Sequence, residues 1–263
     1  MSALWLPLLR RLTERFPGWG LWKNAEDALQ GHGDFDSTAE EGAWDGITDE
    51  FARWAAASGL GPVAACRHVK GALFLAALDE AGSKIFELDV NSRKYFRGWT
   101  VFQPGQLLPV MELDARGFRR VRPGAEGVIL LTQNGLKWGG RQNSEGLARK
   151  RVAEFLSSDL EGVLEAAKLF RPADKALVRA AESAARHDWD RAAMLTVEAR
   201  AVLGALAAPS ILASRVRAKR VKKQCPLLVT IFSDGRTVRG NTDAWIKRVA
   251  GQGEVHDLGA LDR

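Results

Sequence analysis

The stretch Gly31-His32-Gly33-Asp34-Phe35-Asp36-Ser37 decides how the rest of this 263-residue chain is interpreted. In an extended strand, residues i and i+2 point to the same face, so Asp34 and Asp36 would present two carboxylates side by side. Two unpaired acids on one face of a sheet repel each other, and burying them without a partner is costly. A divalent cation removes that cost, and the flanking glycines leave room for a substrate to approach.

A third carboxylate follows about fifty residues later, in Phe86-Glu87-Leu88-Asp89-Val90. Asp89 ends an apolar stretch that is typical of a strand, where it can meet the two earlier acids. Carboxylate oxygens from neighbouring strands form a site for a hard cation such as Mg²⁺. We therefore predict that Asp34, Asp36 and Asp89 are catalytic metal ligands. Glu87 shares the face of Asp89 and is a reserve ligand.

The segments around these acids predict an α+β fold with a mixed β-sheet. Helices are expected over three segments: Ser2–Phe16, Ala25–Leu29 and Asp45–Ser58. Strands are expected over five: Trp19–Trp22, Asp34–Asp36, Val63–His68, Ala72–Leu78 and Lys84–Val90. The helix and strand segments alternate and then end in a β-meander. This order is typical of an α+β domain rather than of repeated βαβ units.

The second half of the chain changes character. Residues 145–208 are rich in alanine and leucine and predict four helices, near 145–157, 159–169, 173–186 and 189–206. A strand over 227–232, a turn and a helix over 242–250 are expected after them. We predict three regions: a first domain over 1–135, a helical domain over 141–208, and a basic segment with a strand-turn-helix element over 209–263.

The charge of the chain is unevenly distributed. Residues 1–140 hold 16 Lys and Arg against 17 Asp and Glu, a net of −1, whereas residues 141–263 hold 22 against 15, a net of +7. Six cations fall within nine residues that contain no acid: Arg215, Arg217, Lys219, Arg220, Lys222 and Lys223. A polyanion such as RNA is the expected partner of this segment. The alternative is a solvated helix face or a linker.

Other features narrow the class of protein. No apolar run approaches the roughly 20 residues of a membrane-spanning helix, so no membrane association is expected. The chain has two cysteines, Cys66 and Cys225, too few for a disulfide framework, which suits a cytoplasmic protein. Nothing in the sequence indicates an oligomeric state.

Three segments together resemble the DNA polymerase β-like nucleotidyltransferase superfamily, and within it small bacterial proteins. They are Leu21-Trp22-Lys23-Asn24, Gly33-Asp34-Phe35-Asp36 and Glu87-Leu88-Asp89, and the resemblance covers roughly residues 5–130. It implies that the three aspartates bind two Mg²⁺ ions and that a nucleoside triphosphate is the donor. Most members carry Gly-Gly or Gly-Ser where this chain has Lys23-Asn24. The donor phosphates are accordingly expected at Lys23, Asn24 and Gly33.

The expected activity is transfer of a nucleoside monophosphate to a hydroxyl acceptor. The basic segment favours RNA or tRNA as the acceptor, in a modifying or toxin-like role. Two alternatives stay open: a sugar or antibiotic as a small-molecule acceptor, and a catalytically inactive RNA-binding protein on the same fold. A second basic cluster could bind triphosphate or acceptor, or could join two domains: Arg116, Arg119, Arg120 and Arg122.

Overall fold

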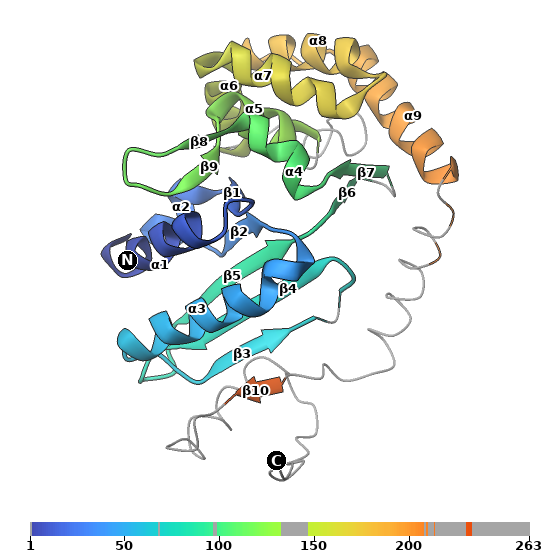
Figure 1. Cartoon of the computed structure of the whole chain (residues 1–263). Coiled ribbons are helices and arrows are strands. Elements are labelled where there is room, and N and C mark those ends of the chain that lie inside the picture. The colour runs from blue at the N-terminus through green and yellow to red at the C-terminus, as the bar shows by residue number, and fades with distance from the viewer. Residues whose placement is uncertain are drawn as a thin grey trace.

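The computed structural model describes residues 2–67, 69–96, 99–132, 147–207, 209, 213 and 230–232 (Figure 1). Its first elements, up to the strand that carries Asp89, are α1 (Ser2–Arg15), β1 (Gly20–Lys23), α2 (Ala25–Gln30), β2 (Phe35–Thr38), α3 (Trp44–Ala57), β3 (Val63–Cys66), β4 (Ala72–Leu78) and β5 (Ile85–Asn91). The later elements are β6 (Lys94–Phe96), β7 (Trp99–Phe102), α4 (Pro104–Leu107), β8 (Met111–Leu113), β9 (Arg119–Val121), α5 (Pro123–Leu130), α6 (Leu147–Ser158), α7 (Leu160–Ala167), α8 (Asp174–Ala185), α9 (Arg191–Ala207) and β10 (Thr230–Phe232).

The protein has an α+β fold with a mixed sheet, as the sequence predicted. In the described part of the chain the main sheet has eight strands in the order β10-β3-β4-β5-β2-β1-β9-β8. The pairs β2–β5 and β1–β9 are parallel, and the other neighbouring pairs are antiparallel. β6 and β7 form a separate two-stranded hairpin. The parallel pairing of β2 with β5 matters most, because it brings the predicted site residues together.

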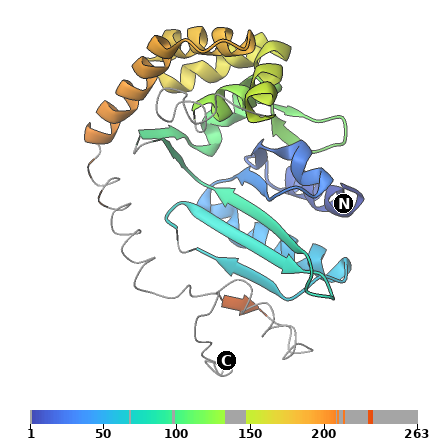
Figure 2. The ribbon, with the colours of Figure 1, turned by 180° about the vertical axis from the view of Figure 1, so that it is seen from behind.

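One face of the sheet is covered by α1 and α3. Burial alternates along β4, where Leu73 and Leu75 are buried among the apolar residues of these helices. Trp5 of α1 stacks on Trp54 of α3 with ring centroids 4.5 Å apart, and Trp54 Nε1 donates a hydrogen bond to the Leu4 carbonyl. Among the described helices, none lies over the opposite face of β3, β4 and β5 (Figure 2). The polar side chains of β5 point to that face.

A second apolar cluster gathers the helices α5–α9 at the β1–β9 end of the sheet (Figure 1). α5 crosses close to its neighbours because two of its residues are glycines. A Cβ at Gly124 would overlap the backbone carbonyl of Asp159, and one at Gly127 would lie 2.9 Å from Leu156 Cδ2. Trp22 of β1 belongs to this second cluster, whereas the preceding Leu21 belongs to the first.

The expected helices and strands up to residue 207 all exist, and their ends lie within two residues of the predicted ones. The strands β6–β9 were not predicted, and they lie in a stretch for which no element was expected. The predicted boundary between the first two domains falls in 133–146, outside the described residues. Of the expected C-terminal strand, residues 230–232 pair antiparallel with β3, and the turn and helix expected beyond them are outside the described part.

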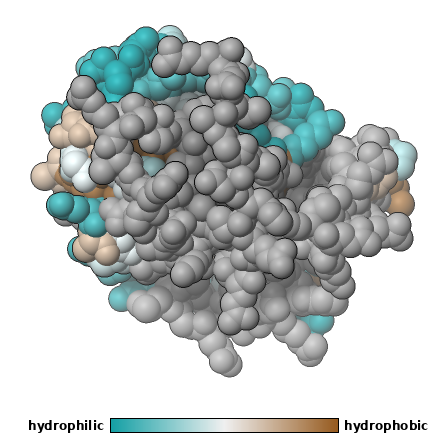
Figure 3. Space-filling model, turned by 90° about the horizontal axis from the view of Figure 1, so that it is seen from below, coloured by the Kyte–Doolittle hydropathy of each residue, from teal (hydrophilic) through white to brown (hydrophobic). Residues whose placement is uncertain are grey.

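None of the helices in the described ranges combines the length and apolar character needed to span a membrane. Figure 3 views the molecule from below, where the visible described residues form hydrophilic areas interrupted by small apolar ones.

Candidate functional site

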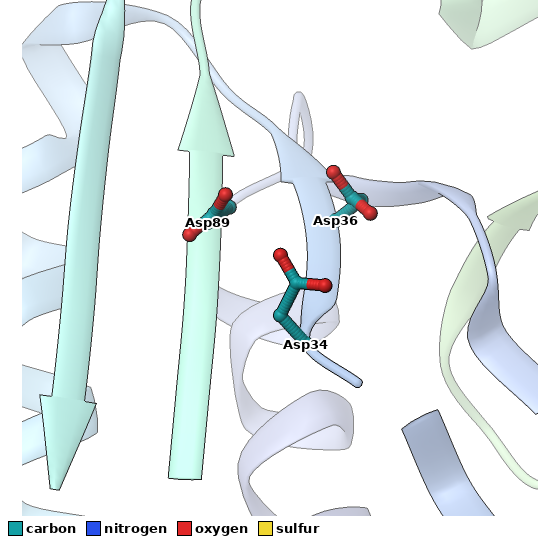
Figure 4. A group of neighbouring side chains, drawn as sticks. All are labelled: Asp34, Asp36 and Asp89. Carbon is teal, nitrogen blue, oxygen red and sulfur yellow. The ribbon is translucent and has the colours of Figure 1, made fainter. Parts of the chain in front are cut away.

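Three carboxylates converge on one face of the sheet (Figure 4). Asp36 of β2 and Asp89 of β5 are direct partners in the parallel pairing, and partners in register point to the same face. Asp34 comes just before β2, two residues before Asp36, and therefore joins them. One oxygen from each of the three residues lies within 4.8 Å of the other two. This confirms the prediction that the three side chains lie close together.

Hydrogen bonds from β2 side chains hold this register. Ser37 Oγ donates to the backbone carbonyl of Asp89 at 2.8 Å, and Thr38 Oγ1 donates to that of Asn91 at 2.7 Å. Both donors are fully buried. Gly33 leads into the strand with φ of +87°, a left-handed conformation that favours glycine. The turn before Asp34 therefore needs glycine for its backbone conformation. It does not need glycine to avoid a steric clash, since no atom lies within 4 Å of a Cβ placed there.

Two of the three acids, Asp36 and Asp89, have a raised pKa. Burial, reinforced by the negative charges of Asp34 and Asp36, raises the pKa of Asp89 to about 8. Asp36 is 4% exposed, and burial raises its pKa although the positive charge of Lys23 opposes the change. The single ammonium of Lys23 offsets only part of the charge of these carboxylates, and their oxygens are the ligands that Mg²⁺ prefers. The donor set therefore fits a hard divalent cation.

Lys23, a predicted phosphate ligand, contacts the trio directly. Its Nζ lies 2.6 Å from Asp36 Oδ2. The same ammonium lies 5.0 Å from the ring centroid of Trp22, and Lys94 Nζ from β6 lies 4.6 Å from that ring. Glu87, the reserve ligand, precedes Asp89 by two residues on β5 and is exposed. It is not among the residues whose oxygens converge.

Asn24 was expected to bind phosphate at the start of α2, but its backbone amide has another partner. It adopts a left-handed conformation with φ of 57°, and its side chain forms no cap. Its backbone N–H instead donates to Glu126 Oε1 at 2.7 Å, so a carboxylate already occupies this amide. Glu126 is 1% exposed, and burial raises its pKa to about 7. Glu126 was not predicted as a site residue, although a single charged residue within an otherwise apolar helix is a recognisable signal.

The arginines of the second basic cluster bind within the protein, and of the four only Arg122 reaches the described helices after residue 146, as a link between two domains would. Arg116 Nη2 lies 2.5 Å from Glu26 of α2, and Arg120 Nη1 lies 2.7 Å from the same carboxylate. The other two arginines also bind within the protein: Arg119 to the carbonyls of Pro17 and Trp19, and Arg122 to Asp159 and Glu161. These contacts link α2, β9 and α7.

Arg151 of α6 adds a further link to α2 through Asp27, and its Nη2 lies 3.8 Å from Glu126 Oε1. The acidic first turn of α2 is thus matched by arginines from β9, the loop before it and α6. The six cations predicted to bind nucleic acid, from Arg215 to Lys223, lie outside the described residues.

Comparison of the chain with protein-family models, with curated proteins and with solved structures found no match.

Proposed function

We propose that this protein is a Mg²⁺-dependent nucleotidyltransferase that moves a nucleoside monophosphate from a nucleoside triphosphate to a hydroxyl acceptor. One observation carries the proposal: Asp34, Asp36 and Asp89, which are far apart in the sequence, bring their oxygens within 4.8 Å of one another on one sheet face. The three segments that resemble DNA polymerase β-like nucleotidyltransferases contain the same three aspartates, and this resemblance supports the proposal.

The three aspartates would have different roles according to their positions in the sheet. Asp34 and Asp36 lie on the β1 side and would hold the ion that carries the donor phosphates, whereas Asp89 lies on the β5 side and would face the acceptor. Bound Mg²⁺ supplies charge neutralisation and lowers the pKa of a hydroxyl, and two ions are expected. The acceptor oxygen forms a bond to the α-phosphorus, its proton passes to water, and the bond to pyrophosphate breaks. In such reactions most of the rate enhancement comes from positioning of the reactants and stabilisation of charge in the transition state.

The acceptor class is part of the proposal. The net charge of +7 over residues 141–263 supports RNA, with the segment Arg215–Lys223 as the main contact. A sugar or antibiotic acceptor would not need this segment. Replacing its six cations with glutamine should weaken RNA binding and flatten its salt dependence if RNA is the acceptor. The same change should leave transfer to a small molecule intact.

A second candidate function is a nucleic-acid-binding protein that kept the fold without catalysis. Two contacts favour this candidate. Lys23 forms an ion pair with Asp36, and Glu126 accepts the hydrogen bond of the Asn24 amide that a phosphate would otherwise accept. Both contacts reduce the affinity of the start of α2 for a triphosphate. This candidate predicts RNA binding without incorporation of nucleotide.

The deciding experiment incubates the full chain with each labelled nucleoside triphosphate, Mg²⁺ and total RNA, and follows label on the RNA. Asp36→Asn should abolish transfer. Asp49→Asn is the matched control, because Asp49 is an exposed acid on α3, which covers the opposite sheet face. Transfer that survives Asp36→Asn would refute the proposed site. RNA binding without any transfer in the unaltered chain would favour the second candidate.

A further inference from the structure

Lys23 supplies the positive charge that contacts the most deeply buried acid of the site. The side chain of Asp36 is 5% exposed and that of Lys23 is 21% exposed, so much of the pair is withdrawn from water. Asp36 Oδ2 is buried and accepts no hydrogen bond of normal geometry, although the lysine Nζ lies 2.6 Å away. The charge of this oxygen is therefore compensated by an ammonium rather than by a fixed set of donors.

A β-bulge in β1 places the side chain of Lys23 on the same sheet face as Asp36. Leu21 pairs with Ser37, and the next pair joins Lys23 to Asp36, which leaves Trp22 as an extra residue in a β-bulge. Regular pairing would place Trp22 opposite Asp36 and would turn the lysine to the other face. Bulges next to functional sites commonly redirect a side chain in this manner. The backbone is thus built to present this lysine to the carboxylates.

The other phosphate ligand expected at this end of the site is already occupied. The Asn24 amide donates to Glu126, and the first turn of α2 contains the acids Glu26 and Asp27. A phosphate chain that approaches from β1 would therefore rely on the ammonium of Lys23. Lysine suits such a role because its charge sits at the end of a flexible four-carbon stem.

We propose that Lys23 exchanges partners, neutralising Asp36 in the metal-free protein and binding the donor's phosphate chain once a divalent cation occupies the carboxylates. This inference rests on the proposed nucleotidyltransferase function. An ammonium and a divalent cation repel each other at one carboxylate, and a triphosphate gives the released ammonium a new anion. Lys23 is then a specificity-determining residue that favours the metal–triphosphate complex over the free ion.

The test measures the affinities for free Mn²⁺ and for a nucleotide analogue, which substitution of Lys23 should change in opposite directions. Binding of free Mn²⁺ is followed by electron paramagnetic resonance, and binding of an α,β-methylene nucleotide analogue is followed by calorimetry with Mn²⁺ present. Lys23→Gln should bind free Mn²⁺ about 10-fold more tightly and the analogue about 10-fold more weakly, because close charge pairs commonly contribute this much. Lys23→Met, which keeps the apolar stem, should behave alike. The control Lys94→Gln removes the other ammonium near the Trp22 ring and should change each affinity by less than about 3-fold.

The outcomes separate this inference from the proposal beneath it. If Lys23→Gln and Lys23→Met weaken both affinities, or leave free Mn²⁺ binding unchanged, the exchange is refuted while the enzyme proposal stands. If the unaltered chain and Asp36→Asn bind Mn²⁺ equally, the three acids are not a metal site and both fail. Opposite shifts in the neutral variants, with Lys23→Arg restoring analogue binding, support the exchange.

Discussion

Replacing Asp89 by asparagine should stabilise the metal-free protein at about pH 8, although the change alters a proposed catalytic residue. The folded chain holds this proton up to about pH 8, whereas the unfolded chain releases it near the ordinary carboxyl pKa of 3.8. The stability of the metal-free protein therefore falls as the pH rises through this window. An asparagine side chain carries no charge, so the variant would lose this dependence.

The magnitude follows from the pKa. A difference between about 8 and 3.8 corresponds to an upper limit of about 6 kcal/mol, at about 1.4 kcal/mol for each pH unit. Asp89 is only partly buried, so solvent screens part of the repulsion. We therefore expect Asp89→Asn to raise the free energy of unfolding by about 2 kcal/mol at about pH 8, and by much less at about pH 4.

The assay is urea unfolding in the presence of a chelator, repeated with Mg²⁺. Mg²⁺ should stabilise the unaltered chain, because it binds the folded state, and should stabilise Asp89→Asn far less. Asp49→Asn serves as the control and should change stability by less than about 0.5 kcal/mol. A lower stability of Asp89→Asn than of the unaltered chain at about pH 8 without metal would refute the claim that burial and the neighbouring acids disfavour the ionised form of Asp89.

Three further predictions concern the surroundings of the site. Ser37→Ala removes the buried hydrogen bond to the Asp89 carbonyl and should cost about 1–2 kcal/mol in chemical unfolding. Gly124→Ala should cost about 3 kcal/mol or more, because its Cβ would overlap the backbone before α7, whereas Gly42→Ala meets nothing within 4 Å and is its control. Glu126→Gln should reduce the loss of stability that the unaltered chain shows between about pH 4.5 and pH 7, since the folded-state pKa of Glu126 is raised to about 7 and the variant removes this group's share; an unchanged pH profile in chemical unfolding would contradict this.

The helices and strands with clear periodicity could be predicted from the sequence, and so could the meeting of the three aspartates. Alternation fixed the face of Asp34 and Asp36, and the apolar stretch before Asp89 placed it on a strand. The strands between residues 94 and 121 were missed because runs of three or four residues carry little periodicity, and no apolar stretch or pair of acids marked these strands as it marked β1, β2 and β3.

The contacts that define the electrostatics of the site could not be predicted. The pairing of Lys23 with Asp36 depends on a one-residue bulge, which no spacing rule places in advance. The bond from Asn24 to Glu126 joins residues 102 positions apart and depends on how α5 packs near β1. Asn24 was expected to bind the donor phosphates, whereas in the structure its backbone amide donates to this distant carboxylate.

The extra residue in β1 also has a structural consequence. Leu21 is anchored among the residues under α1 and α3, and Trp22 is anchored among the helices α5–α9. A single peptide unit therefore joins the two apolar clusters, and the next side chain along the chain, Lys23, is the one that contacts Asp36. The position of the charge beside Asp36 is thus tied to how the side chains of both clusters pack around β1.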